Sequence, residues 1–196
     1  MPLKLQSLWH YHQEAFGFHI NLHSPHSYAS NPLTWLYLGR PTSFFFELYK
    51  PGENGCTLET GCASAVTALG NPLIWYAALA ALIFLVIRYV RVRESASGLV
   101  LLGLAAGYLP WMLYMNRTIF QFYAIAFLPW LILGLILGLK RWLQSKPVEQ
   151  RRGSERLLIG LFALFGLVSA YFYPIWSAME VPYWFWYGHM WLPSWI

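Results

Sequence analysis

Aspartate is absent from this chain, and charge of either sign is scarce. The eight acidic residues are all glutamates, and charged residues make up 11% of the 196. An ordinary soluble domain carries about 25% charged residues, so this surface is too apolar for water alone. Hydrophobic residues reach 58% and aromatic residues 19%. The composition excludes an ordinary soluble domain and indicates that lipid covers part of the surface.

The first 20 residues lack the apolar run of a cleavable signal peptide, because lysine, glutamate and three histidines interrupt them. The net charge of +5 does not indicate a nucleic-acid partner, because Lys and Arg form no basic face interleaved with aromatic residues. They gather in two short segments between apolar runs, which is the pattern of a membrane protein.

Four apolar runs are each long enough to cross a bilayer, for which about 20 helical residues suffice. They cover residues 71–90, 98–115, 118–139 and 157–179. Backbone amides in lipid must find partners within their own segment, so we expect four transmembrane helices. The alternative is a soluble all-α core, but four such runs in one short chain are rare in soluble proteins. Gly and Ala positions in 98–106 and 134–138 predict faces that pack against other helices.

The distribution of basic residues predicts the topology. Nine of the thirteen lie in the first and third connections: Arg88, Arg91, Arg93, Lys140, Arg141, Lys146, Arg151, Arg152 and Arg156. By the positive-inside rule these connections are cytoplasmic. Residues 1–70, the turn near Arg117 and the aromatic tail 180–196 are then extracytoplasmic, in a multi-pass protein of the cell membrane.

The non-spanning part has its own expected elements. Leu5–Phe18 is expected as an interfacial helix anchored by aromatic side chains. Residues 31–40 are expected as irregular chain or one short helix, followed by an extended stretch over 43–49. Pro110 and Pro129 lie inside the second and third runs, where each should kink or locally unwind its helix.

The only two cysteines, Cys56 and Cys62, flank a glycine-containing loop on the expected outer face. Outside the cytosol such a pair can form a disulfide bond; two free thiols are the alternative. Two cysteines make only half of a zinc site. Five histidines lie within 17 residues (His10, His12, His19, His23 and His26), but their spacing fits no metal motif, so no metal is predicted.

Arg40 and Arg117 are the arginines of the expected outer side. Arg117 follows Asn116 at the mouth of a helical hairpin, where a guanidinium is costly unless it reaches the headgroups or meets an anion. A lipid phosphate fits, since guanidinium pairs with phosphate through two hydrogen bonds. Simple contact with bulk headgroups remains open. Asn116–Thr118 is also a glycosylation sequon, but it lies too close to the membrane to be a good acceptor.

The stretch 24–41 reads SPHSYASNPLTWLYLGRP and resembles a loop of the protein O-mannosyltransferases. The matching positions are His26, Tyr28, Ser30, Pro32, Trp35, Arg40 and Pro41. Ser27 and Leu33 depart from the family's usual Pro and Trp. The stretches 69–75, 114–123 and 187–191 resemble the actinobacterial branch, so the resemblance covers nearly the whole chain.

This resemblance implies the C-terminal part of a C-type glycosyltransferase fold. Members move mannose from a polyprenyl- or dolichyl-phosphate carrier to Ser or Thr hydroxyls of exported proteins, without a cofactor. His26, Arg40 and Arg117 are the predicted contacts for donor phosphate or substrate. The family's catalytic acid lies in an early external loop that this chain does not contain. Glu14 and Glu47 do not match it, so we expect the N-terminal half of the enzyme as a partner.

Two other readings stay open. The chain could be an inert fragment that folds in the membrane and transfers nothing. It could also belong to a related lipid-phosphate-sugar glycosyltransferase that acts on cell-wall glycans, because the fold and the donor class are shared more widely than the acceptor.

Overall fold

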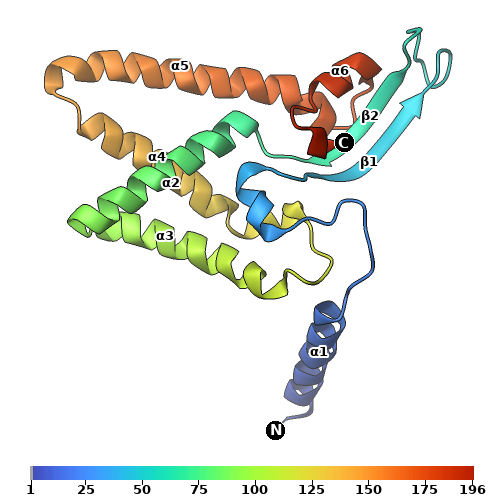
Figure 1. The fold of residues 1–196 in the computed structure, drawn as a ribbon, viewed down its shortest axis with the longest axis horizontal. Coiled ribbons are helices and arrows are strands. Elements are labelled where there is room, and N and C mark those ends of the chain that lie inside the picture. Colours follow the sequence, from blue (N-terminus) through green and yellow to red (C-terminus); the bar gives the residue numbers. More distant parts are fainter. Residues whose placement is uncertain (1) are drawn as a thin grey trace.

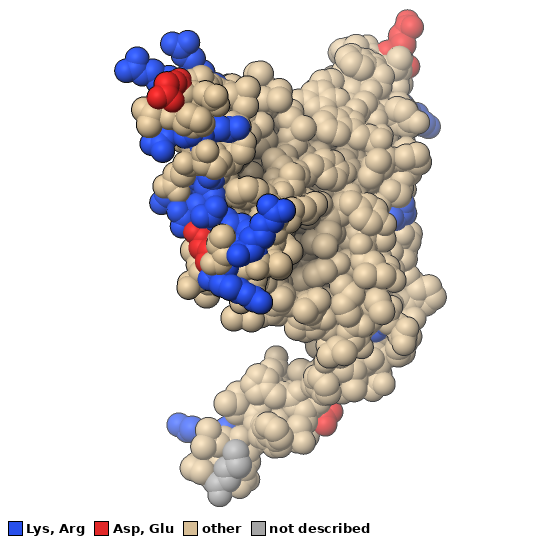
Figure 2. Space-filling model, turned by 60° about the vertical axis from the view of Figure 1, so that its left-hand side comes forward, with Lys and Arg blue, Asp and Glu red and all other residues tan. Residues whose placement is uncertain are grey.

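A computed structural model describes residues 2–196, and four long helices form its body (Figure 1). They are α2 (Pro72–Val92), α3 (Ser95–Tyr108), α4 (Leu128–Gln144) and α5 (Val148–Phe172). The α2–α3 and α4–α5 connections lie at the same end, on the left of Figure 1. We call it the basic end, because Lys and Arg gather there (Figure 2), and the opposite end the capped end.

Among the described residues, three helices are long and apolar enough to cross a membrane: Pro72–Val92, Ser95–Tyr114 and Val148–Trp176. The second includes the 3-10 helix η2 (Leu109–Tyr114), and the third includes η4 (Tyr173–Trp176). α4 is also apolar, with 17 residues. The predicted mostly helical membrane fold is therefore confirmed.

The third apolar run differs from the expected continuous helix. Its first part is an extended stretch and the 3-10 helix η3 (Gln121–Ala126), and the α-helix begins only at Leu128. Pro129 lies in the first turn of α4, where its missing N–H costs nothing, instead of kinking a helix interior. Pro110 lies where α3 changes to the more tightly wound 3-10 helix η2, whereas a kink or local unwinding was expected.

Glycines allow α4 to approach its neighbours closely. A Cβ on Gly138 would lie 2.8 Å from the Cβ of Ala81 on α2, and one on Gly103 of α3 would lie 2.3 Å from the Trp130 ring on α4. Neither position has room for a larger side chain. The expected small-residue faces therefore meet helices within this chain.

One carboxylate joins three helices at the basic end. Glu94 lies between α2 and α3, and its oxygens pair with Arg88 Nε of α2 at 2.7 Å and with Arg141 of α4. Ser97 Oγ of α3 donates to the same carboxylate at 2.7 Å. The hydrogen bonds from Ser97 and Arg88, with the charges of Arg88 and Arg141, hold the pKa of Glu94 below its ordinary value against the effect of partial burial.

The capped end holds a small antiparallel sheet in the order β1–β2–β3. Its strands are β1 (Thr42–Tyr49), β2 (Cys62–Ala68) and the short β3 (Val181–Pro182). β1 pairs along the whole of β2, with a bulge between Ser43 and Phe45. The short helices η1 (Pro32–Tyr37), α6 (Tyr183–Gly188) and η5 (Pro193–Trp195) complete the cap.

Helix α1 (Leu3–Ile20) contains the expected interfacial helix but has no buried residue. It lies crosswise to the long helices and extends away from them near the capped end (Figure 1). Trp9, Tyr11 and Phe16 are all exposed. This placement suits a helix in the plane of a headgroup layer.

Candidate functional site

The loop that follows α1 is bound to the turn between α3 and α4. Thr118 N donates to the Leu22 carbonyl at 3.0 Å, and Ser30 N donates to the Ile119 carbonyl at 2.8 Å. The His23 ring Nδ1 lies 2.9 Å from the Asn116 carbonyl. The motif at 24–41 and the stretch around Arg117 therefore form one continuous surface at the capped end.

Aromatic side chains fix η1 in the middle of this surface. Trp35 is fully buried, and its Nε1 donates to Ser30 Oγ at 2.8 Å. Tyr108 of α3 donates its hydroxyl to the Pro32 carbonyl at 2.9 Å, and Trp75 of α2 donates Nε1 to the Leu36 carbonyl at 2.8 Å. The Leu36 carbonyl lies at the C-terminal end of η1, where a helix leaves carbonyls without partners, and the bonds from Tyr108 and Trp75 tie the motif to the spanning helices.

Arg40 is fully engaged with backbone carbonyls. Its Nη1 donates to the carbonyls of Ser194 and Ile196, each at 2.7 Å, and its Nη2 donates to the Ser27 carbonyl at 3.0 Å. The guanidinium also lies 5.2 Å from the centre of the Tyr28 ring. Its side chain therefore joins the motif loop to the C-terminal segment, and these bonds occupy much of its capacity to bind an anion.

Gln121 positions the backbone of Arg40 and was not among the predicted residues. It is 2% exposed, and its Oε1 accepts a hydrogen bond from Arg40 N at 3.0 Å. A polar residue inside the third apolar run was the signal that could have found it, because buried amides need partners.

Arg117 has a different environment from Arg40. No hydrogen bond or ion pair joins its guanidinium to another described residue, and its Nε is buried without a partner. The guanidinium lies 5.9 Å from the centre of the Tyr114 ring. It borders a cavity of about 240 Å³ between η2 and the last turn of α1, which Phe16, His19 and Ile20 also line. A half-buried cation with free donors can bind an anion there.

His26 lies on the exposed side of the same surface. Its Nδ1 accepts a hydrogen bond from Tyr28 N at 3.1 Å, which leaves Nε2 to carry the proton in the neutral ring. The ring packs edge-on against Phe120 at 5.0 Å between centroids. His26 and Arg40 thus both touch Tyr28, whereas Arg117 borders the separate cavity beside α1.

Glu14 and Glu47, the two acidic residues compared with the family's catalytic acid, lie in other contacts. Glu14 lies on α1, 4.0 Å from His10, with both side chains largely exposed. Glu47 accepts a hydrogen bond from the Tyr49 hydroxyl, and this bond raises the pKa of Tyr49. Neither carboxylate contacts His26, Arg40 or Arg117 in the described residues.

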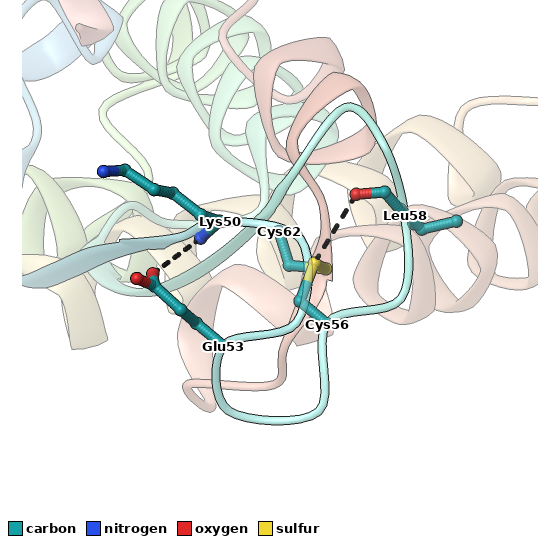
Figure 3. The surroundings of a disulfide bond; sticks show 5 residues. All are labelled: Lys50, Glu53, Cys56, Leu58 and Cys62. Atoms are coloured by element: carbon teal, nitrogen blue, oxygen red, sulfur yellow. Dashed lines mark hydrogen bonds between the residues drawn. A yellow bond between two sulfur atoms is a disulfide. The ribbon is translucent and has the colours of Figure 1, made fainter.

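A disulfide bond joins Cys56 and Cys62 at the tip of the β1–β2 hairpin, with Cα atoms 5.8 Å apart (Figure 3). Glu53 accepts a hydrogen bond from Lys50 N at 2.9 Å in the same loop. Glu180 lies beside the two sulfur atoms, but sulfurs joined to each other are not thiolate ligands. The group therefore does not have the donors that a metal ion requires.

The fold and this surface define a multi-pass membrane protein whose loops form a compact site at one end of its helices. Residues 4–195 match the family described as the C-terminal four-transmembrane region of protein O-mannosyltransferase, and the chain belongs to that family. The structure also resembles the yeast (S. cerevisiae) protein O-mannosyltransferase Pmt1–Pmt2 complex bound to the sugar donor. That match has a TM-score of 0.76 and 25% identity, and it covers 94% of this chain and 26% of the yeast chain.

Curated relatives carry a more specific name. The chain is 33% identical over 201 residues to the polyprenol-phosphate-mannose–protein mannosyltransferase of Mycolicibacterium smegmatis, covering 100% of this chain and 38% of the relative. The enzymes of the same name from Mycobacterium tuberculosis and Corynebacterium glutamicum are 31% and 28% identical, over 100% and 99% of this chain and 38% of each relative. The chain thus spans somewhat more than a third of the length of these relatives.

Proposed function

We propose that this chain is the C-terminal portion of an enzyme that transfers mannose from polyprenyl-phosphate-mannose to Ser and Thr hydroxyls of exported proteins. The family match over residues 4–195 carries this proposal. The names of the mycobacterial relatives supply the donor and the type of acceptor. Because the chain spans 38% of those relatives, the N-terminal part of the enzyme is the necessary partner.

Arg117 is our candidate contact for the donor phosphate. Its guanidinium pairs with no acidic residue in the part of the chain that the structure describes, and it borders a cavity beside an exposed, aromatic helix. A membrane-bound carrier presents its phosphate at this depth, so an arginine here neutralises charge that grows as the phosphate leaves the sugar. His26 contributes an exposed Nε2–H to the same face, and Arg40 holds the loop that presents His26.

The reaction also needs a base that accepts the proton of the acceptor hydroxyl. We assign that task to a carboxylate of the N-terminal part, because Glu14 and Glu47 lie in other contacts. The hydroxyl oxygen then attacks the anomeric carbon while the lipid phosphate departs, with inversion at that carbon. No cofactor takes part in this displacement.

We further propose that the capped end faces the extracytoplasmic side of the cell membrane. The α2–α3 and α4–α5 connections, which carry most of the basic residues, lie together at the opposite end (Figures 1 and 2). The positive-inside rule then places residues 1–70 and 180–196 outside, where acceptors leave the membrane and where a disulfide bond persists.

The test is mannosyl transfer from polyprenyl-phosphate-mannose to a Ser/Thr peptide in membranes. The chain would be assayed alone and with the N-terminal part of a complete relative supplied in trans. Activity only with the added part is the expected result. Activity of the chain alone would place the base within it and return attention to Glu14 and Glu47. Inactivity in both, while the complete relative works, would favour the inert fragment. Transfer to a cell-wall glycan but not to peptide would favour the other acceptor class.

A further inference from the structure

An apolar groove runs between α2, α4 and α5 in the half of the bundle nearest the basic end. Its volume is about 330 Å³, and every residue that lines it is apolar. Ala77, Ala80 and Ala81 of α2 contribute short side chains to it. Leu158 and Leu161 line it from α5.

The packing of α5 explains why the groove stays open. Gly138 brings the backbone of α4 against Ala81 of α2, so these two helices are in close contact. The glycines of α5 approach no other helix in this way, and its two buried side chains, Phe165 and Phe172, lie nearer the capped end. The small side chains of α2 cannot fill the resulting space.

Two cations lie at the basic end of the groove. Lys146 follows α4, and its Nζ lies 4.9 Å from the centre of the Trp142 ring, which lines the groove. Arg151 lies two turns before Leu158, on the same face of α5. Arg151 Nε donates to the Lys146 carbonyl at 3.3 Å, so the two residues are neighbours. Among the described residues neither forms an ion pair with a carboxylate, and Figure 2 shows how strongly positive this end is.

We propose that this groove binds an anionic phospholipid, with one acyl chain against α2, α4 and α5 and the phosphate between Lys146 and Arg151. An apolar channel that ends at two unpaired cations complements such a lipid in both hydrophobicity and charge. The volume suits a hydrocarbon chain better than another helix, whose diameter with side chains is about 10–12 Å. This site lies at the end opposite the proposed donor site and does not depend on mannosyl transfer.

The proposal is tested by titrating the purified 196-residue chain with phosphatidylglycerol or phosphatidylcholine and measuring bound lipid by native mass spectrometry. We expect tighter binding of phosphatidylglycerol. Changing Lys146→Gln and Arg151→Gln together should weaken that binding by about fivefold for each cation lost, with phosphatidylcholine unaffected. Ala80→Leu should fill the groove and weaken the binding of both lipids.

Lys140→Gln with Arg152→Gln is the matched control, because it removes the same charge from positions off the two groove-lining faces. An equal loss of phosphatidylglycerol in this control would overturn the proposal, since binding would then follow net charge alone. Unchanged binding in Ala80→Leu, or a dimer of chains with no retained lipid, would overturn it as well. Circular dichroism of every variant checks that helix content is kept, and Ala80→Gly, which enlarges the groove without blocking it, should keep both lipids.

Discussion

At the basic end of the bundle one carboxylate joins three helices. At the capped end one guanidinium joins the loop of residues 24–41 to the C-terminal segment. Glu94 pairs with Arg88 and Arg141, so the charges of these two arginines are balanced by a carboxylate. Arg40 donates instead to the backbone oxygens of Ser27, Ser194 and Ile196, which occupy its guanidinium. Arg117, by contrast, pairs with no acidic residue among those that the structure describes.

This difference separates two uses of arginine. Where a carboxylate is present, the arginine contributes to stability and the carboxylate neutralises its charge. Where no described residue binds the guanidinium, as at Arg117, its donors remain available to an anion. At the capped end, Arg117 is therefore the arginine that is suited to a phosphate ligand.

The largest expected effect on stability comes from removing the carboxylate. Glu94→Gln leaves Arg88 and Arg141 partly buried without a counter-charge, which should cost about 3 kcal/mol, the lower end for a broken buried pair because both arginines reach solvent. Thermal unfolding in detergent, followed by tryptophan fluorescence, measures it. Glu155→Gln is the control, because Glu155 is exposed and forms no ion pair with another described residue. Equal unfolding temperatures in the two variants would contradict the account of the basic end.

Removing the Arg40 guanidinium at the capped end should lower the free energy of unfolding by somewhat less. Arg40→Gln leaves three carbonyls without their donor, for which we expect a loss of about 2 kcal/mol. Arg40→Lys should rescue this only in part, because an ammonium cannot match the planar fork of the guanidinium. Limited proteolysis of the C-terminal segment reports the local change. Full protection of that segment in Arg40→Gln would show that the hydrogen bonds of Arg40 are not needed to hold it in place.

Loss of the disulfide bond should have an effect of similar size that stays local. Changing Cys56→Ser and Cys62→Ser together opens a short loop, for which the chain-entropy estimate is about 2 kcal/mol, confined to the hairpin tip. We expect faster cleavage within residues 50–61 and little change in the unfolding of the helices. A large drop in the unfolding temperature of the whole chain would mean that the hairpin supports the bundle.

Acidification should reproduce part of the loss of stability that is expected for Glu94→Gln. The pKa of Glu94 is lowered in the folded chain, so its stabilisation is present above the ordinary value of 4.5 and is lost as the pH falls through the lowered pKa. Unfolding temperature measured from pH 7 to pH 3 should therefore fall at the acidic end, and by less in Glu94→Gln than in the wild type. Parallel pH profiles would assign the fall to other groups.

Local patterns in the sequence predicted the long helices, the helical conformation of α1 and the extended stretch of β1. They did not predict β2, because its short run of small residues (CASAVTA) forms a strand only when β1 lies beside it. The late start of α4 at Leu128 was missed for a similar reason. Ser30 and Leu22 bind the 118–119 backbone in an extended form, which an apolar run does not reveal.

The candidate site was predicted in its residue types but not in their roles. His26, Arg40 and Arg117 could be selected from the motif and from charge. That Arg40 bonds to residues more than 150 positions away, at Ser194 and Ile196, depends on tertiary structure alone. The different environments of the two arginines could therefore be established only from the tertiary structure.

The most direct test of this account compares Arg117→Gln with Arg40→Gln in the complete enzyme, measuring unfolding temperature and donor kinetics together. We expect Arg117→Gln to change stability by no more than about 0.5 kcal/mol, as for a surface change, while raising the donor KM or lowering kcat. Arg40→Gln should lower the unfolding temperature. An unchanged donor KM and kcat in Arg117→Gln, with a loss of stability like that of Arg40→Gln, would contradict the claim that Arg117 is held free for an anion.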